Sequence, residues 1–316
     1  MKRTRSSILI CFLLLGSDVS FSQSSINRFL TPGDSLDKKR VWLVGGSWAV
    51  IYTGTMISLS QVWYADYPKS SFHFFNDGGE WLQMDKVGHA YTAYFESVWT
   101  TDALQWAGVD RKKSAWIGAA TGFFFQSSIE LLDGFSSEWG ASPGDLTADF
   151  LGSALSLSQY LLWNEQRFQL KFSTHIETYP DDLKTRTDDL FGTAFYERML
   201  KDYNAQTYWL SVVPSTFIKN PENKFPRWLS FAVGYSGDGM LGANENVWEE
   251  NGETIERRDI PRLRQFYFAP DVDLTRIKTN SAFLKTFFAI ANVIKVPAPA
   301  IEVNSQGHFK FHPVYF

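Results

Sequence analysis

The sequence has one cysteine among its 316 residues, and this residue, Cys11, lies in an apolar run close to the N-terminus. We therefore expect no disulfide bond and no thiolate chemistry in the rest of the chain. An excess of positive charge is also lacking, because 30 Lys and Arg stand against 34 Asp and Glu, for a net charge of −4. Since no basic stripe is present either, we expect no nucleic-acid partner.

The familiar catalytic motifs are missing as well. The sequence contains no His-Glu-x-x-His, no Gly-x-Ser-x-Gly and no glycine-rich phosphate loop. It also contains no internal repeat and no low-complexity tract. Any chemistry must therefore come from a less common arrangement of residues.

The N-terminus has the pattern of an export signal. Basic residues at positions 2, 3 and 5 precede apolar residues 8–16, and the small residues Ser20 and Ser22 come just before Gln23. This pattern predicts a cleaved signal peptide over residues 1–22. An uncleaved anchor is the alternative, but the apolar run is shorter than the roughly 20 residues that span a bilayer. We expect an exported protein of the periplasm or outer membrane of a Gram-negative-type cell.

The next part of the chain has four helical patterns. A polar segment over residues 23–40 is followed by apolar helical sequence at residues 41–63, 85–106, 114–132 and 145–163. We expect these helices to form a hydrophobic four-helix bundle over residues 41–164. The first of them carries no charge, so it either crosses a membrane or is buried inside the bundle. The sequence leaves both alternatives open.

The second half changes to strand patterns. Phe168, Leu170 and Phe172 alternate with polar residues, which indicates a strand with two different faces. Further strands are predicted at residues 208–213, 228–235, 265–273 and 309–316, and helices at residues 188–203 and 281–294. Residues 165–316 are therefore expected to form an antiparallel β-rich region, either a partial barrel or a sheet, with one or two extra helices. The predicted fold class is α+β.

Charged residues interrupt the predicted helices in three short polar motifs. Within each motif two side chains lie three or four positions apart, so each pair faces one way from its own helix. The pairs are Asp85 with His89, Glu130 with Asp133, and Asp145 with Asp149. Because such groups cost several kcal/mol to bury without partners, we expect them to meet in one polar cluster between helices.

Two main kinds of role suit this cluster. One is a structural hydrogen-bond network, in which the carboxylates cap helices and accept bonds from the histidine. The other is a catalytic or metal centre, with a sensing role as a third alternative. The catalytic candidates are Asp85, His89, Glu130, Asp133 and Asp145, and a metal would be held by His89, Glu130, Asp133 and Asp149. The pattern identifies no cofactor.

The three motifs read DKVGH from Asp85, ELLDG from Glu130 and SPGDLTADFLG from Ser142. Together they resemble the YfiM-like family of predicted periplasmic lipoproteins, a domain of unknown function, and more distantly the VanZ-like helical membrane proteins. The resemblance covers roughly residues 41–163 and implies an envelope location and four hydrophobic helices, without an activity. The chain departs from the family because Cys11 is too early for lipid attachment, and because Asp149 stands where Asn is expected.

Two functional hypotheses follow. The first is an uncharacterised membrane-associated cell-envelope protein whose helical bundle is locked by a buried Asp/His/Glu network. The alternative is an envelope hydrolase, with or without a metal, that acts on a lipid or cell-wall substrate through the same cluster. In both cases the expected partner is a membrane lipid or another envelope component. The sequence does not decide whether the protein is an enzyme, and it does not give the oligomeric state.

Overall fold

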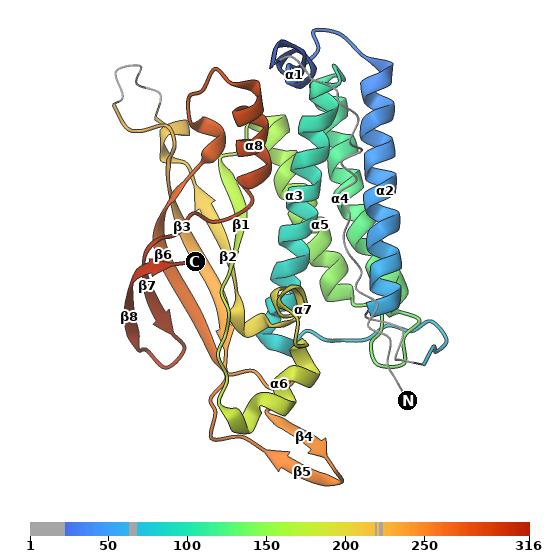
Figure 1. Ribbon diagram of the computed structural model, residues 1–316, viewed down its shortest axis with the longest axis vertical. Helices are drawn as coiled ribbons and strands as arrows, with labels where there is room; N and C mark the ends of the chain where they lie inside the picture. The colour runs from blue at the N-terminus through green and yellow to red at the C-terminus, as the bar shows by residue number, and fades with distance from the viewer. Residues whose placement is uncertain (1–22, 63–67, 219, 221–223) are drawn as a thin grey trace.

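A computed structural model describes residues 23–62, 68–218, 220 and 224–316. The predicted signal peptide, residues 1–22 with Cys11, lies outside the described residues and stays a prediction. The fold is α+β, as expected, with helices in the first half and an antiparallel sheet in the second (Figure 1).

The first half contains a short helix, α1, and the four predicted long helices. Their bounds are α1 Gln23–Leu30, α2 Lys38–Val62, α3 Met84–Trp106, α4 Arg111–Asp133 and α5 Pro143–Trp163. Two of the long helices begin at side-chain caps: Asp110 accepts a hydrogen bond from the Lys113 N–H, and Ser142 accepts one from the Asp145 N–H. These caps explain why α4 and α5 begin where they do.

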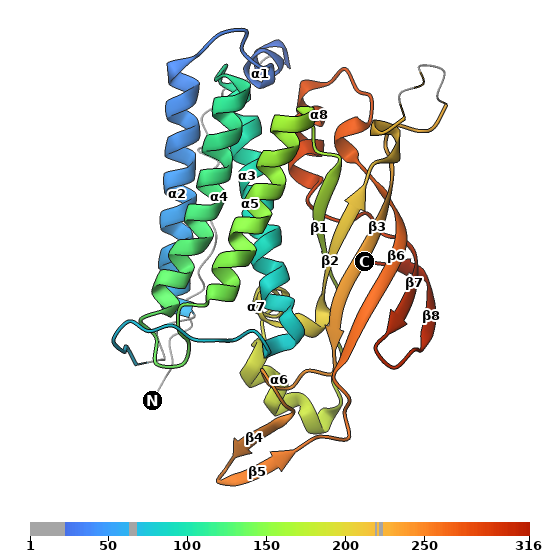
Figure 2. The ribbon, with the colours of Figure 1, turned by 180° about the vertical axis from the view of Figure 1, so that it is seen from behind.

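Small residues allow α3, α4 and α5 to pack closely. A Cβ atom at Gly122 of α4 would overlap the Ala93 carbonyl oxygen of α3, and one at Gly152 of α5 would overlap the Ala90 carbonyl oxygen. Since only glycine leaves room for such backbone contact, α3 lies against both neighbouring helices. In both ribbon views α3 lies on the side of the bundle that faces the sheet (Figures 1 and 2).

Helix α2 lies on the outside of the bundle. It contacts α4 through aromatic rings, with Trp48 and Tyr52 at 5.2 and 4.7 Å from the Phe125 ring. Most of its apolar side chains remain uncovered, and Trp42 and Val50 are 81% and 74% exposed. The alternative of a fully buried helix is therefore wrong. By length and composition, this is the one helix among the described residues that could cross a membrane.

The main sheet has six antiparallel strands in the order β1-β2-β3-β6-β7-β8. Their bounds are β1 Phe168–Thr174, β2 Gln206–Val212, β3 Leu229–Asp238, β6 Leu263–Val272, β7 Ala298–Asn304 and β8 Phe309–Tyr315. The sheet is open and antiparallel, as expected for the β-rich region. A separate hairpin pairs β4 Val247–Glu250 with β5 Glu253–Glu256.

Helix α3 joins the two halves of the molecule. Its Tyr91 ring lies 5.8 Å from Phe172 of β1 and 5.6 Å from Tyr208 of β2, and the Tyr91 hydroxyl donates to the Val293 carbonyl. The Tyr94 hydroxyl donates to the Phe168 carbonyl. The edge of the sheet formed by β1 and β2 is therefore packed on α3.

Several predicted elements need correction. The single helix expected at residues 188–203 is two helices, α6 Lys184–Phe191 and α7 Phe195–Lys201, because Gly192 between them has φ 79° and ends the first. The last helix is α8 Ala282–Ala291. Strands β4, β5 and β7 were not predicted. Short 3₁₀ turns lie at Glu80–Gln83, Asp181–Leu183, Tyr203–Ala205, Pro214–Thr216 and Leu274–Arg276.

Candidate functional site

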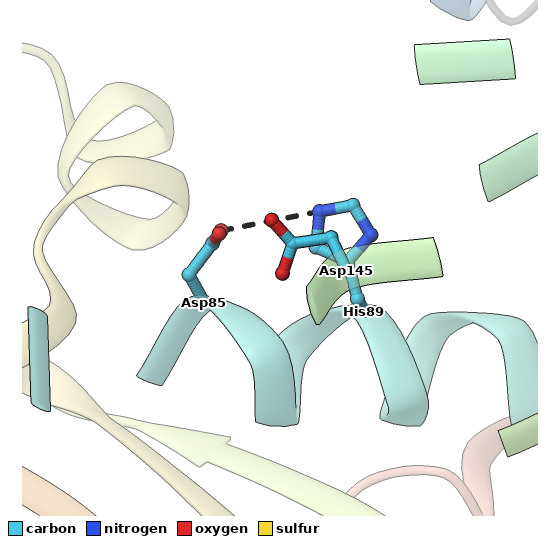
Figure 3. Close-up of side chains that lie close together, drawn as sticks. All are labelled: Asp85, His89 and Asp145. Carbon is cyan, nitrogen blue, oxygen red and sulfur yellow. Dashed lines mark ion pairs between the residues drawn. The ribbon is translucent and has the colours of Figure 1, made fainter. Parts of the chain in front are cut away.

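The polar cluster forms where three helices meet at one end of the bundle. Asp85 and His89 come from the first turns of α3, Glu130 from the last turn of α4, and Asp145 and Asp149 from the first turns of α5. Figure 3 shows Asp145 of α5 lying against the Asp85 and His89 side chains of α3. The i,i+4 spacing within α3 and α5 turns both members of each pair toward the other helix.

His89 links α3 to the two other helices. Its Nδ1 atom lies 2.9 Å from Asp149 Oδ1, and its Nε2 atom lies 3.5 Å from Glu130 Oε1 and 4.0 Å from Asp85 Oδ1. Burial favours the neutral ring, but the hydrogen bond to Asp149 and the charges of Asp85 and Asp149 outweigh burial and raise the pKa of His89 to about 10. The ring is therefore a cation at neutral pH.

Lys86 supplies the second positive charge. Its Nζ atom lies 2.7 Å from Asp77 Oδ2, 3.0 Å from Asp145 Oδ1 and 3.6 Å from Asp85 Oδ2. Burial opposes its charge, but these carboxylates outweigh burial and raise the pKa of Lys86 above its ordinary value. The ammonium thus holds together α3, α5 and the loop before α3.

Ser142, which could have served as a nucleophile, is fully engaged as a helix cap. Its hydroxyl donates to Asp77 Oδ1 at 2.6 Å and accepts from the Asp145 N–H at 3.1 Å. The Ser142 N–H donates to Glu130 Oε2 at 2.8 Å. The hydroxyl lies against a carboxylate already paired with Lys86, and this arrangement positions the start of α5.

Acidic groups outnumber basic groups in the cluster. Five carboxylates, those of Asp77, Asp85, Glu130, Asp145 and Asp149, surround the cations Lys86 and His89. Burial raises the pKa of Glu130 to about 7, and burial together with the charge of Asp85 raises the pKa of Asp145. The cluster therefore balances its excess negative charge in part by holding protons.

The structure brings together most of the predicted residues, namely Asp85, His89, Glu130, Asp145 and Asp149. Asp133 is half-buried in the last position of α4, and its charge contributes to the raised pKa of Glu130. Two members were not predicted. Asp77 lies in a turn shortly before α3, and Tyr203 of the β-rich half donates its hydroxyl to Asp85 Oδ1 at 2.7 Å.

A cation would find one ligand atom on each of Asp85, His89 and Asp145, since these atoms lie within 4.8 Å of one another. Carboxylate and imidazole ligands of this kind suit Zn²⁺ or Mn²⁺. His89 must lose its proton before it can bind a metal, so a metal would have to compete with that proton. The arrangement can therefore act as a proton-holding network or, with a change of protonation, as a metal site.

Fold and site together define an α+β protein with a helical bundle, closed at one end by a buried acidic network. Residues 73–161, less than a third of the chain, match the model of a family described as "Predicted periplasmic lipoprotein (DUF2279)". This family has no assigned function, and its matched range contains the three motifs but not α2. The narrower resemblance to YfiM-like and VanZ-like proteins stays a prediction. No curated protein and no solved structure matches the chain.

The family description agrees with the localisation expected from the sequence, which is export to the periplasm or outer membrane. Its word "lipoprotein" has less support in this chain. The one cysteine, Cys11, lies within the apolar run of the predicted signal peptide, where a lipid-attachment site is not expected.

Proposed function

We propose that this chain is a non-catalytic, membrane-associated protein of the cell envelope, whose bundle is locked by the polar cluster. The observation that carries the proposal is the placement of the two cations. Lys86 binds carboxylates from α5 and from the loop before α3, while His89 binds Asp149 of α5 and faces Glu130 of α4. Each cation therefore joins segments that are distant in sequence.

The contacts around Asp85 extend the lock to the β-rich half. Asp85 accepts the Tyr203 hydroxyl bond, and Trp81, just before α3, has its ring 5.6 Å from that of Tyr203. Groups held in this way fix the position of α3 relative to its neighbours on several sides. A buried network of this type specifies one arrangement of helices, because any other arrangement would leave charges without partners.

Membrane association is supported by α2. The helix is uncharged from residue 41 to residue 62, and at 1.5 Å per residue this stretch is about 33 Å long, enough for the roughly 30 Å of bilayer hydrocarbon. Its exposed side chains are large and apolar, including Trp42, Val50 and Ile57. A surface of this kind is stable in lipid and unfavourable in water.

The test of the lock is His89→Ala, with His308→Ala as the matched control because His308 is exposed. Removing the His89 ring leaves the buried Asp149 carboxylate without its cation, which typically costs about 3–5 kcal/mol. We expect His89→Ala to lower the thermal unfolding midpoint and the yield of folded protein, and His308→Ala to leave both unchanged. Equal stability of the two variants would contradict the lock.

One observation favours the alternative of a metal-assisted envelope hydrolase. Besides the three candidate ligand atoms, the buried oxygen Asp149 Oδ2 has no hydrogen-bond partner among the described residues. If this function is correct, Zn²⁺ or Mn²⁺ added to the purified protein will bind stoichiometrically and raise its unfolding midpoint, and Asp85→Asn will abolish that rise. Elemental analysis after metal loading gives the stoichiometry, and no bound metal would argue against this alternative.

A further inference from the structure

The six-stranded sheet is apolar on its outward side, whereas its enclosed side mixes polar and apolar side chains. Buried polar residues on the enclosed side are Gln169, Lys171, Thr207, Ser211, Ser230, Ser236, Asp271 and Glu302, and they surround a small apolar cluster of Trp209, Ala232, Tyr267, Ala269 and Ala300. In β1 the alternation is complete, since each buried position is Gln, Lys or Ser and most positions between them are apolar. A sheet in water shows the opposite distribution.

The outward side of the sheet is apolar on every strand. One row of paired residues crosses all six strands, and its members are Leu170, Leu210, Val233, Phe268, Ile301 and Phe311. A second row, also without a charge, consists of Phe172, Tyr208, Tyr235, Phe266, Val303 and Phe309. Charged side chains on these strands belong to the other face or to the strand ends.

Helix α3 and the turn before it cover part of this apolar face, because the Tyr91 ring packs on Phe172 and Tyr208, and the Tyr235 hydroxyl donates to the Leu82 carbonyl. Outside these contacts, Val233 is 55% exposed, Phe268 51% and Phe311 64%. The exposed part continues directly from the packed part, because the same rows of residues run through both. In water, so large an apolar surface would be unfavourable and prone to aggregation.

A second apolar surface lies on the opposite flank of the molecule. In both ribbon views α2 and α4 form one side, and strands β6, β7 and β8 form the other (Figures 1 and 2). Trp116 of α4 and Leu162 of α5 are 60% and 70% exposed, in addition to the exposed residues of α2. Because the two surfaces face away from each other, a flat membrane surface cannot touch both, whereas a bilayer surrounding the molecule can.

Charges are confined to the two ends of the elements that face outward. Residues 114–129 of α4 and 150–163 of α5 are uncharged, like residues 41–62 of α2. Strands β3 and β6 have ten residues each, about 33 Å of extended chain, which matches the roughly 30 Å of hydrocarbon. Asp102 of α3 is exposed, but it accepts the Tyr160 hydroxyl bond one turn from the end of its helix.

We propose that bilayer hydrocarbon surrounds this protein and contacts the outward face of the sheet as well as α2, α4 and α5. The long axis of the molecule then lies along the membrane normal. The polar cluster, together with α6, α7 and the β4–β5 hairpin, lies at one end, outside the uncharged segments. This proposal deepens the membrane association assigned above to α2, and it can fail while that association holds.

Hydrocarbon requires partners for the backbone groups at the sheet edges, and each edge has a feature that provides for some of these groups. At the β1 edge, the Phe172 N–H donates to the Val293 carbonyl, and the Phe172 carbonyl accepts from the Lys295 N–H. At the other edge, β8 contains Pro313, which has no N–H group to leave unpaired. The Tyr315 hydroxyl lies 2.9 Å from Thr207 Oγ1 of β2, so β8 curves back over the inner face.

The test uses single nitroxide labels on the full chain, with Cys11→Ser as background and the protein reconstituted in phosphatidylethanolamine–phosphatidylglycerol vesicles. The label sites are Val233→Cys and Phe268→Cys on the sheet, Val50→Cys on α2, and Thr254→Cys on the exposed β4–β5 hairpin as the control. Electron paramagnetic resonance then compares relaxation by oxygen, which concentrates in hydrocarbon, with relaxation by a water-soluble nickel chelate. Circular dichroism confirms that each labelled variant is folded.

We expect the oxygen-to-nickel accessibility ratio to be several-fold higher at residues 233, 268 and 50 than at residue 254. A high ratio at residue 50 with nickel-accessible labels at 233 and 268 would overturn the sheet proposal and leave the α2 anchor in place. A low ratio at residue 50 together with high ratios on the sheet would instead remove the α2 anchor. Labels on the sheet shielded from both reagents would also overturn the proposal, because a protein partner or a second copy would then cover that face.

Discussion

Replacing Lys86 by Met should destabilise the helical bundle, because Met removes the charge and keeps a side chain of similar length. The Lys86 ammonium lies 2.7 Å from Asp77 and 3.0 Å from Asp145, and the three side chains are 14%, 15% and 3% exposed. Removing one partner of a buried ion pair costs about 3–5 kcal/mol. Since Lys86 and Asp77 keep some contact with water, we expect a loss of about 3 kcal/mol of unfolding free energy.

The assay is urea unfolding of the detergent-solubilised protein, followed by circular dichroism. The matched control is Arg258→Met, because Arg258 is 67% exposed and pairs with Glu245 and Glu256, which are more than half exposed. Exposed pairs of this type contribute at most about 1 kcal/mol. A second variant, Lys86→Met combined with Asp145→Asn, should recover part of the loss, because it also removes one of the carboxylates left without a cation.

Two outcomes would refute this reasoning. If Lys86→Met and Arg258→Met lose the same stability, the buried ammonium contributes no more than a surface pair. If Lys86→Met and Asp145→Asn simply add their losses in the double variant, the two groups are not coupled, and the 3.0 Å contact between them has no energetic meaning.

Two further predictions concern the same interfaces. The pKa of His89 is raised from 6.5 to about 10, so its cation stabilises the fold fully below pH 6.5, and this contribution is lost as pH rises through 10. The thermal unfolding midpoint of the wild type should therefore fall more steeply between pH 7 and 10 than that of His89→Ala. Parallel pH profiles of the two proteins would contradict this prediction. Gly152→Ala should destabilise the protein by about 1–3 kcal/mol, because the added methyl group would overlap the Ala90 carbonyl. Gly45→Ala is the control: a methyl group at Gly45 would meet no atom within 4 Å, so this variant should be neutral or stabilising by up to about 1 kcal/mol. Thermal unfolding of the two glycine variants side by side checks that difference.

The parts of the site that the sequence predicted are those set by local geometry. The i,i+4 spacing of Asp85 with His89 and of Asp145 with Asp149 fixes a common face on each helix, so their convergence followed from the cost of burying them alone. Asp77 and Tyr203 could not be found in this way. Asp77 lies in an Asn-Asp-Gly-Gly turn that has no helical face, and Tyr203 reaches Asp85 only through the docking of the β-rich half.

The missed elements of the fold have local causes too. Strand β7 begins Ala298-Pro299-Ala300, and proline between small residues gives no strand signal; its pairing with β6 and β8 supplies the strand conformation. Residues 188–203 have helical composition, but Gly192 adopts a positive φ that ends α6. The α2 alternatives could not be decided from sequence, because an uncharged helix has the same composition whether protein or lipid surrounds it.

The way the helices pack inside the bundle also agrees with a lipid surrounding, and this observation does not depend on the exposed apolar faces. In hydrocarbon, helices gain little from burying apolar side chains against one another, so small residues and hydrogen bonds must hold them together. The contacts of α3 are of this kind. Gly118 and Gly122 of α4 and Gly152 of α5 bring their backbones against α3, where Ser97 and Thr101 are fully buried and donate to carbonyls of their own helix.

A lipid surrounding would also give the polar cluster a role in choosing helix partners. If lipid surrounds the bundle, the helices cannot rely on the exclusion of water to choose their partners, and the charged groups at the end of α3 provide that choice instead. Loss of Lys86 or His89 should then alter which helices contact one another, in addition to lowering stability. Crosslinking between cysteines placed on α3 and α5 in the membrane-bound Lys86→Met variant would show this as a loss of the wild-type crosslink, whereas an unchanged crosslink would mean that the glycine contacts alone specify the bundle.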